Sequence, residues 1–401
     1  MGISSSTKKA IKMGLLFSIV YFIVYVSRNV LSAITPKLLE NGYTENFIAK
    51  LSSLFFITYA LGQLINGILG DKVKAKYMLF IGLLFSGIFQ FVLPFVLENA
   101  LLSIISYGIS GFFLSMIYAP MTKVVAENND VLTSSRISVA YNFSLYFGSP
   151  VAGLLSTFLI WQAVIYSSSI ALIVMSFILL FFFFRFERSG IINYPEKEKI
   201  FTEKNNYSIL FKRQIIKYSF VSIITGIVRT SVVFWLPTYI NKYLNFPVET
   251  STLLFTIVSF VLCISTFIAL FLYERLRHNL NLSLFISFVL SAVFFLLTFL
   301  IGLPFLNLIF ISLAIIFSNC ASSLMWNVYC PSLADTGLVS SATGYLDFLS
   351  YLAAAVANIL FANAVSKIGW GNLIFVWLLL IIVGIIVCVP IKIIKKRKST
   401  I

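Results

Sequence analysis

Long runs of apolar residues alternate with short polar segments along almost the whole chain. A helix needs about 20 apolar residues to cross a bilayer, so this pattern predicts twelve membrane-spanning helices. Their expected ranges are residues 13–38, 47–69, 77–97, 101–124, 134–158, 162–185, 214–241, 250–273, 281–302, 305–329, 338–362 and 370–391. An even number of spans places both termini on the same side of the membrane.

The longest polar segment, residues 187–213, divides the predicted spans into six and six. Its many charges predict a cytoplasmic linker with one surface helix. Residues 1–186 and 214–401 then align as an internal repeat, the second half ending in a basic tail. We therefore expect an all-α membrane protein whose two six-helix halves are related by a pseudo-two-fold axis.

Composition and charge agree with a membrane protein. Hydrophobic residues make up 60% of the chain and charged residues 11%, whereas a soluble domain carries about 25% charged residues. The net charge of +15 comes from basic residues in the gaps between spans, which argues against nucleic-acid binding. The outer loops hold only Lys37, Lys50, Lys242 and Lys367, so the positive-inside rule predicts a multi-pass protein of the cell (inner or plasma) membrane with cytoplasmic termini.

The residues that could perform enzyme chemistry are scarce. The four cysteines (Cys263, Cys320, Cys330 and Cys388) lie in apolar runs without metal or redox spacing, and His278 is the sole histidine. Neither a metal site nor a nucleophile–base pair can be assembled from them. We expect no enzyme activity and no cofactor.

Two arginines lie within predicted membrane spans, where a charged side chain is energetically unfavourable. Arg28 lies near the middle of the first predicted span and Arg229 near the middle of the seventh, and a proline follows each at the same separation. A guanidinium at this depth costs a few kcal/mol, so such residues are functional by default. Each can donate two parallel hydrogen bonds to a phosphate or carboxylate, which predicts an anion-binding site. The alternative is that each reaches an interface or pairs with a structural acid.

Other polar side chains share helical faces within the spans. Tyr21 and Tyr25 lie on the face of Arg28, Tyr59 and Gln63 are one turn apart in the second span, and Asn142 and Tyr146 are one turn apart in the fifth. We expect these residues to line a substrate cavity. The alternative is aromatic packing and hydrogen bonding between helices.

Three acidic residues complete the set of candidates. Asp347 lies deep in the eleventh span, where it could be the counter-ion of Arg229, a proton carrier or an acceptor for sugar hydroxyls. Asp71 and Glu274 each open a basic loop after the second span of their half, in GDKVKAK and YERLRHN. We expect both to be gate or interface residues that pair with nearby bases and helix ends.

Several motifs carry a resemblance to a known family: YxxxYxxR followed by NGYT, TYALGQLINGILGDK, YAPMTK and VRTSVVFWLPTYI. They resemble the organophosphate:phosphate antiporters of the major facilitator superfamily, which include the glycerol-3-phosphate and hexose-6-phosphate transporters. The resemblance implies that Arg28 and Arg229 clamp a phosphoryl group, and that Tyr21, Tyr25, Tyr59 and Tyr351 help to line the cavity.

The chain departs from that family at three positions. Gln63 stands where the bacterial carriers have a lysine, Leu145 where the glycerol-phosphate type has a histidine, and Asp347 where the family has a small residue. The expected cavity is therefore less basic than that of the family.

These features predict a monomeric secondary transporter that exchanges an organic phosphate, of the sugar-phosphate or glycerol-phosphate class, for inorganic phosphate by alternating access. One alternative is a proton-coupled symporter of a carboxylate or sugar acid, with Asp347 as the proton carrier. Another is a membrane sensor of sugar phosphates that binds its ligand but hardly transports it.

Overall fold

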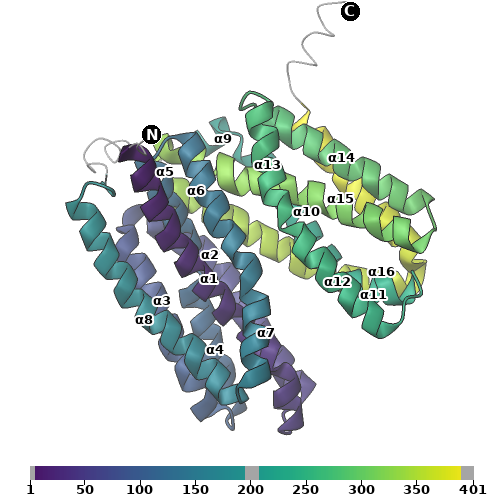
Figure 1. Ribbon diagram of the computed structural model, residues 1–401, viewed down its shortest axis with the longest axis horizontal. Coiled ribbons are helices and arrows are strands. Elements are labelled where there is room, and N and C mark those ends of the chain that lie inside the picture. The colour runs from purple at the N-terminus through teal and green to yellow at the C-terminus, as the bar shows by residue number, and fades with distance from the viewer. Residues whose placement is uncertain (1–4, 195–206, 390–401) are drawn as a thin grey trace, which may run out of the picture. The chain divides into compact units, whose positions relative to one another are not determined.

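The computed structural model describes residues 5–194 and 207–389, and every regular element in these residues is a helix (Figure 1). The α-helices are α1 Ser5–Glu40, α2 Glu45–Lys72, α3 Ala75–Val96, α4 Ala100–Leu114, α5 Tyr118–Asn128, α6 Val131–Ser144, α7 Gly148–Phe158, α8 Trp161–Arg188, α9 Ser208–Lys212, α10 Ile215–Gly226, α11 Val233–Lys242, α12 Val248–Leu262, α13 Ile264–Arg275, α14 Leu280–Leu300, α15 Pro304–Leu324 and α16 Val339–Cys388. Short 3₁₀ or π segments are η1 Leu145–Phe147, η2 Ile227–Val232, η3 Met325–Tyr329 and η4 Pro331–Thr336. The prediction of an all-helical membrane protein is confirmed.

The helices coincide with the predicted spans. Within the described ranges, nine helical runs are long and apolar enough to cross a membrane. The other three predicted spans are helical but irregular or less apolar: 134–158 comprises α6, η1 and α7, 214–241 comprises α10, η2 and α11, and 338–362 is the first part of α16. The helix α16 covers most of the last two predicted spans and breaks at Gly369, where φ is 74°. Residues 390 and 391 of the last predicted span lie outside the described residues.

Two predicted polar segments are only partly described. Of the predicted linker 187–213, residues 195–206 lie outside the described part of the chain, as does the basic tail beyond residue 389. The short helix α9 lies at the end of the predicted linker.

Contacts between residues group the chain into two compact units. Unit 1 comprises Met1–Ile209 and Cys330–Phe348, and unit 2 comprises Leu210–Tyr329 and Leu349–Ile401. The segment Cys330–Phe348, which holds η4 and the start of α16, therefore packs with unit 1. The division into six-helix halves at residues 187–213 stays a prediction from the sequence repeat.

Polar caps mark where several helices begin. Thr44, Asn99, Asp130 and Asn279 each accept a hydrogen bond from a backbone N–H in the first turn of the following helix. These side chains satisfy donors that the helix itself leaves unpaired. At the N-terminus of α6, hydrogen bonds from the Thr133 side chain and then from its backbone N–H lower the pKa of Asp130 below its ordinary value.

Small residues bring the helices of unit 1 close together. A β-carbon added at Gly87 of α3 would lie 2.9 Å from the Ser169 carbonyl oxygen of α8, and one added at Gly111 of α4 would lie 2.6 Å from the Phe55 carbonyl oxygen of α2. Between membrane helices, such close backbone approach replaces the hydrophobic drive that acts in water.

The tightest crossing of this kind joins α2 to the start of α16. A β-carbon added at Gly344 would collide with the Gln63 backbone oxygen and lie 2.8 Å from the Gly67 α-carbon. Positions 67 and 344 therefore both require glycine if α2 and α16 are to approach this closely.

In unit 2, a buried asparagine hydrogen-bonds to the backbone carbonyl groups at the end of α14. Asn307 of α15 donates to the carbonyl oxygens of Thr298 and Ile301 at 2.7 and 2.8 Å, where α14 ends. Its own side-chain oxygen accepts a hydrogen bond from the hydroxyl of Tyr239 in α11. The two helix ends and α11 are thereby joined around one buried amide.

The α2–α16 crossing yields a stability prediction. Replacing Gly344 by alanine should lower the free energy of unfolding by about 1–3 kcal/mol or more, because backbone atoms cannot move aside cheaply. The matched control is Gly153→Ala, where no atom lies within 4 Å of the added carbon. Thermal unfolding of both purified variants checks this, and equal melting temperatures would contradict the proposed close contact.

Candidate functional site

Arg28 of unit 1 lies on α1 against three aromatic rings. Its guanidinium carbon is 4.5 Å from the ring centre of Tyr59 and 5.4 Å from those of Tyr25 and Phe56. The side chain is half-buried. Aromatic faces attract a cation and more so where water is excluded, so the rings offset part of the cost of burying the charge. The structure thus brings Arg28, Tyr25 and Tyr59 together, and their role in binding a substrate stays a prediction.

The backbone next to Arg28 is fixed by a neighbour that the sequence analysis missed. The Ser27 hydroxyl donates to Gln90 Oε1 of α3 at 2.6 Å, and Gln90 Nε2 donates back to the Ser27 carbonyl oxygen at 3.2 Å. Both side chains are buried. A lone amide in the apolar span 77–97 was the signal that could have identified Gln90.

Two contacts from α7 hold the same stretch of α1. Gly148 allows α7 to begin against Tyr25, since an added β-carbon would lie 2.6 Å from the Tyr25 carbonyl carbon. Further along, the Ser156 hydroxyl donates to the Ala33 carbonyl oxygen at 2.8 Å. α1 is therefore braced from α3 and α7 on either side of Arg28 in sequence.

Gln63 of α2 lies one turn beyond Tyr59 and is fully buried. Neither its amide nitrogen nor its amide oxygen has a hydrogen-bond partner among the described residues. A buried polar group left in this way costs about 1–3 kcal/mol. An amide with an unused donor and acceptor is suited to bind the polar part of a ligand.

Tyr21 belongs to a cluster of tyrosines. Its ring centre lies 4.9 Å from that of Tyr25, 5.6 Å from that of Tyr118 and 5.7 Å from that of Tyr141. Tyr118, which the sequence analysis missed although it lies in the YAPMTK motif, hydrogen-bonds to the side chain of Asn142. The cluster therefore joins candidates from α1 and α6 to the start of α5.

Asp347, on the first part of α16, lies beside this cluster and is 5% exposed. Its charge acts on Tyr118 and on the thiol of Cys330, both in unit 1. Tyr146 lies on η1, half-buried, with its ring centre 6.5 Å from that of Phe143. Pairing of Asp347 with Arg229 stays a prediction.

Arg229 of unit 2 lies in the π-helical segment η2. Its Nη2 donates to the Ser350 hydroxyl at 3.4 Å, and its guanidinium carbon is 5.9 Å from the ring centre of Tyr351. Gly226 admits the backbone of Ser350, whose carbonyl oxygen would lie 2.8 Å from an added β-carbon. Single π turns inside helices recur at functional sites. Arg229 and Tyr351 are thus neighbours, and the cavity-lining role that the resemblance implies for Tyr351 stays a prediction.

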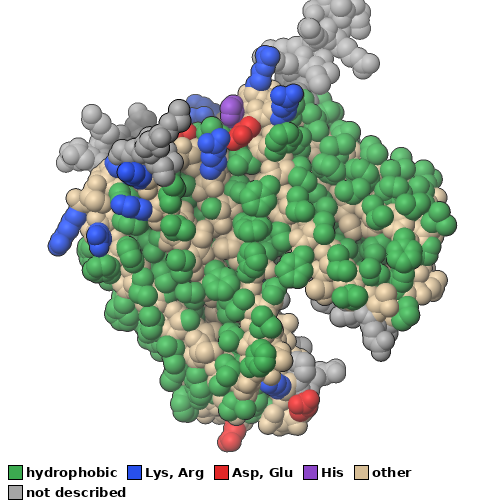
Figure 2. Space-filling model, viewed as in Figure 1, with side chains coloured by type: hydrophobic (Ala, Val, Ile, Leu, Met, Phe, Trp, Pro, Cys, Tyr) green, Lys and Arg blue, Asp and Glu red, His purple; other side chains and the backbone are tan. Residues whose placement is uncertain are grey.

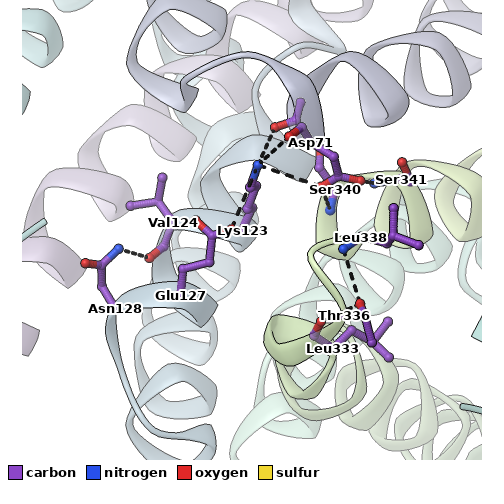
Figure 3. A network of polar contacts seen from close by, with 11 residues as sticks. Asp71, Lys123, Val124, Glu127, Asn128, Leu333, Thr336, Leu338, Ser340 and Ser341 are labelled. Atoms are coloured by element: carbon purple, nitrogen blue, oxygen red, sulfur yellow. Dashed lines mark hydrogen bonds and ion pairs between the residues drawn. The ribbon is translucent and has the colours of Figure 1, made fainter. Parts of the chain in front are cut away.

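Asp71 caps the N-terminus of α16 within unit 1 (Figure 3). Its Oδ1 accepts from the Ser340 backbone N–H at 2.9 Å, and its Oδ2 accepts from that of Ser341 at 2.7 Å. A carboxylate at this end also meets the positive pole of the helix dipole.

Lys123 of α5 completes this network. Its Nζ donates to the carbonyl oxygens of Gly70 and Asp71 at 2.9 and 3.1 Å. The same atom lies 3.9 Å from a carboxylate oxygen of Asp71 and 3.9 Å from one of Glu127. Asp71 thus meets both a base and a helix end. Glu274, expected to act similarly, is half-buried in the last turn of α13 in unit 2.

The cap on α16 yields a second prediction. Asp71→Asn keeps one acceptor but removes the charge and the second acceptor, so we expect a loss of about 1–3 kcal/mol in unfolding free energy. Asp130→Asn, which alters an exposed cap of α6, is the control and should cost less. Thermal unfolding measures both, and an equal or smaller loss for Asp71→Asn would refute a strong buried cap.

Comparisons with known proteins follow the fold. The model of the Major Facilitator Superfamily matches residues 17–358. Among solved structures, the transporter FucP in the outward conformation superposes with a TM-score of 0.73 at 15% identity, covering 95% of this chain and 98% of that chain. A bacterial homologue of the iron transporter ferroportin gives a TM-score of 0.72 at 16% identity, covering 94% and 98%. At these identities the likeness establishes the fold.

Similarity in sequence extends to named relatives over shorter stretches. The chain is 22% identical over 250 residues to the glycerol-3-phosphate transporter of Bacillus subtilis (strain 168), covering 57% of this chain and 56% of that protein. It is 34% identical over 76 residues to the membrane sensor protein UhpC of Escherichia coli (strain K12), covering 19% and 17%. The chain therefore spans about half the length of the first relative and under a fifth of the second.

These relatives confirm the predicted resemblance to the family that includes glycerol-3-phosphate transporters, and the structural neighbours are transporters, not enzymes. Because the superfamily model covers most of the sequence, this chain belongs to the Major Facilitator Superfamily.

Proposed function

We propose that the protein is a secondary transporter that exchanges an organic phosphate for inorganic phosphate by alternating access. The observation that carries the proposal is a half-buried arginine in the corresponding span of each sequence half, each with a tyrosine ring beside it: Arg28 with Tyr59, and Arg229 with Tyr351. The similarity to a glycerol-3-phosphate transporter supports a phosphorylated substrate.

In this proposal the two guanidiniums bind the phosphoryl group and nearby neutral groups bind the organic part. A planar guanidinium donates two parallel hydrogen bonds to phosphate oxygens, which a lysine cannot do. Gln63 supplies an amide with unused hydrogen-bonding capacity on the helix that carries Tyr59. Tyr21, Tyr25, Asn142 and Tyr146 supply further polar atoms.

Exchange follows from the cost of dehydrating charge. When an empty carrier closes around two guanidiniums, it loses their hydration without a counter-charge, so the empty form changes sides slowly. A bound phosphate dianion supplies that counter-charge, and the halves can then rock around the site. Transport in one direction therefore requires an anion to return in the other.

The membrane location and assembly are part of the same proposal. The distribution of basic residues favours a cell membrane with both termini cytoplasmic. A monomer suffices, because each chain carries both arginines.

Two observations favour other functions. Similarity to the membrane sensor protein UhpC supports a sensor, which would bind its ligand with little flux. The buried carboxylate of Asp347 beside Tyr118 supports a proton-coupled symporter of an organic anion.

The arginine variants test anion exchange. Arg28→Lys and Arg229→Lys should each reduce phosphate exchange in reconstituted vesicles by about 10- to 100-fold, the value of a lost charge-assisted hydrogen bond. Arg275→Lys, at an exposed position ending α13, is the control and should keep full exchange. Undiminished exchange in either inner variant would overturn the proposal, and ligand binding by the wild type without any exchange would favour the sensor.

The variant Asp347→Asn distinguishes phosphate exchange from proton symport. Under exchange, Asp347→Asn should still exchange phosphate, and uptake should not depend on an imposed pH gradient. Uptake driven by a pH gradient in the wild type and lost in Asp347→Asn would establish the symporter instead. Both are measured as uptake of labelled substrate into vesicles with and without the gradient.

A further inference from the structure

One end of the α3–α8 pair carries a cluster of exposed cations. Lys74 immediately precedes α3, and Arg185 and Arg188 lie in the last turn of α8. All three side chains are exposed. Figure 2 shows Lys and Arg side chains gathered at this end of unit 1, where α1 also begins, above a hydrophobic surface.

A salt bridge ties the two helix ends together beneath these cations. Lys76 Nζ lies 2.7 Å from Glu187 Oε2, and both side chains are largely buried. Glu187, which precedes Arg188 in the chain, is thereby paired with a base inside the protein. Lys74, Arg185 and Arg188, which we call the basic end, therefore carry an excess of positive charge.

The ring of Tyr194 and a lysine of α1 lie next to the basic end. Lys74 Nζ lies 5.3 Å from the ring centre of Tyr194, and Lys9 Nζ donates to the Gly190 carbonyl oxygen at 2.9 Å. Burial, followed by the charge of Glu187, raises the pKa of Tyr194, so its hydroxyl stays neutral and adds no negative charge.

An apolar strip continues from the basic end along both helices. Its side chains recur about one turn apart on one face of each helix and are between 37% and 61% exposed; they include Tyr77, Ile81 and Phe85 on α3, and Phe177, Phe181 and Phe184 on α8. The ring centre of Phe80 on α3 lies 5.5 Å from that of Phe177 on α8, so side chains of the two helices meet along the strip. We call it the α3–α8 face.

We propose that the basic end and the α3–α8 face together bind a phospholipid with a net negative headgroup. The face matches an acyl chain, and the cations lie at the end of the apolar strip, where a headgroup begins. Lysine and arginine form strong charge-assisted hydrogen bonds with phosphate oxygens, and each basic group near an anionic lipid surface contributes to binding. A zwitterionic headgroup carries its own cation and gains less.

The test uses the purified full chain with phosphatidylglycerol or phosphatidylcholine, and measures bound lipid by native mass spectrometry. The wild type should prefer phosphatidylglycerol. The variant Lys74→Gln/Arg185→Gln/Arg188→Gln should bind it about tenfold more weakly or worse, while its affinity for phosphatidylcholine stays unchanged.

Two controls keep the proposal falsifiable. The variant Lys212→Gln/Arg275→Gln/Arg277→Gln removes three exposed cations from unit 2 and should retain the preference. If both triple variants lose the preference for phosphatidylglycerol equally, the site is not specific and the proposal is overturned. An unchanged preference in the Lys74→Gln/Arg185→Gln/Arg188→Gln variant would overturn it as well. If the first variant does not fold, the wild type at high ionic strength decides, since exposed charges are screened there: a preference that persists contradicts the proposal.

Discussion

A guanidinium within a membrane-spanning segment must be compensated, and much of the described structure around Arg28 and Arg229 meets that requirement. Arg28 lies against the rings of Tyr25, Phe56 and Tyr59, while Arg229 contacts Ser350 and lies near Tyr351. These contacts reduce the cost of burying each charge.

The same constraint governs the other polar groups in the apolar helices. Asp71 accepts hydrogen bonds from backbone N–H groups in the first turn of α16. Asn307 donates to carbonyl oxygens at the end of α14, and Gln90 of α3 and Ser27 of α1 hydrogen-bond to each other. In hydrocarbon, unsatisfied polar groups are costly, so these pairs also specify which helices meet. Gln63 is the contrasting case, since its buried amide has no partner among the described residues, and this supports a ligand-binding role.

The length of the apolar runs was sufficient to predict most of the helices. The irregular ones were harder, because the π turn that carries Arg229 and the break at Gly369 depend on backbone geometry, which a hydropathy pattern does not encode. The packing of Cys330–Phe348 with unit 1 also depends on contacts far apart in sequence, such as Asp71 with Ser340.

In the candidate site too, features within one helix could be predicted from the sequence, whereas contacts between helices could not. The proximity of Tyr25 to Arg28 could be predicted, because helical periodicity places both on one face of the first span, whereas the contact of Tyr59 with Arg28 joins two helices. Gln90, Lys123 and Tyr118 were missed, because each acts through a partner on another helix. A polar residue alone in an apolar span was the available signal for Gln90, and its partner could not be inferred from spacing.

The anion-binding role of the two arginines is tested most directly by equilibrium ligand binding to the purified wild type, measured as a shift in melting temperature. A ligand that binds the native state raises its apparent stability. Inorganic phosphate and glycerol 3-phosphate should both raise the melting temperature, and uncharged glycerol at the same concentration should not. Stabilisation by glycerol equal to that by its phosphate ester, or by no phosphorylated compound at all, would contradict the role assigned to Arg28 and Arg229.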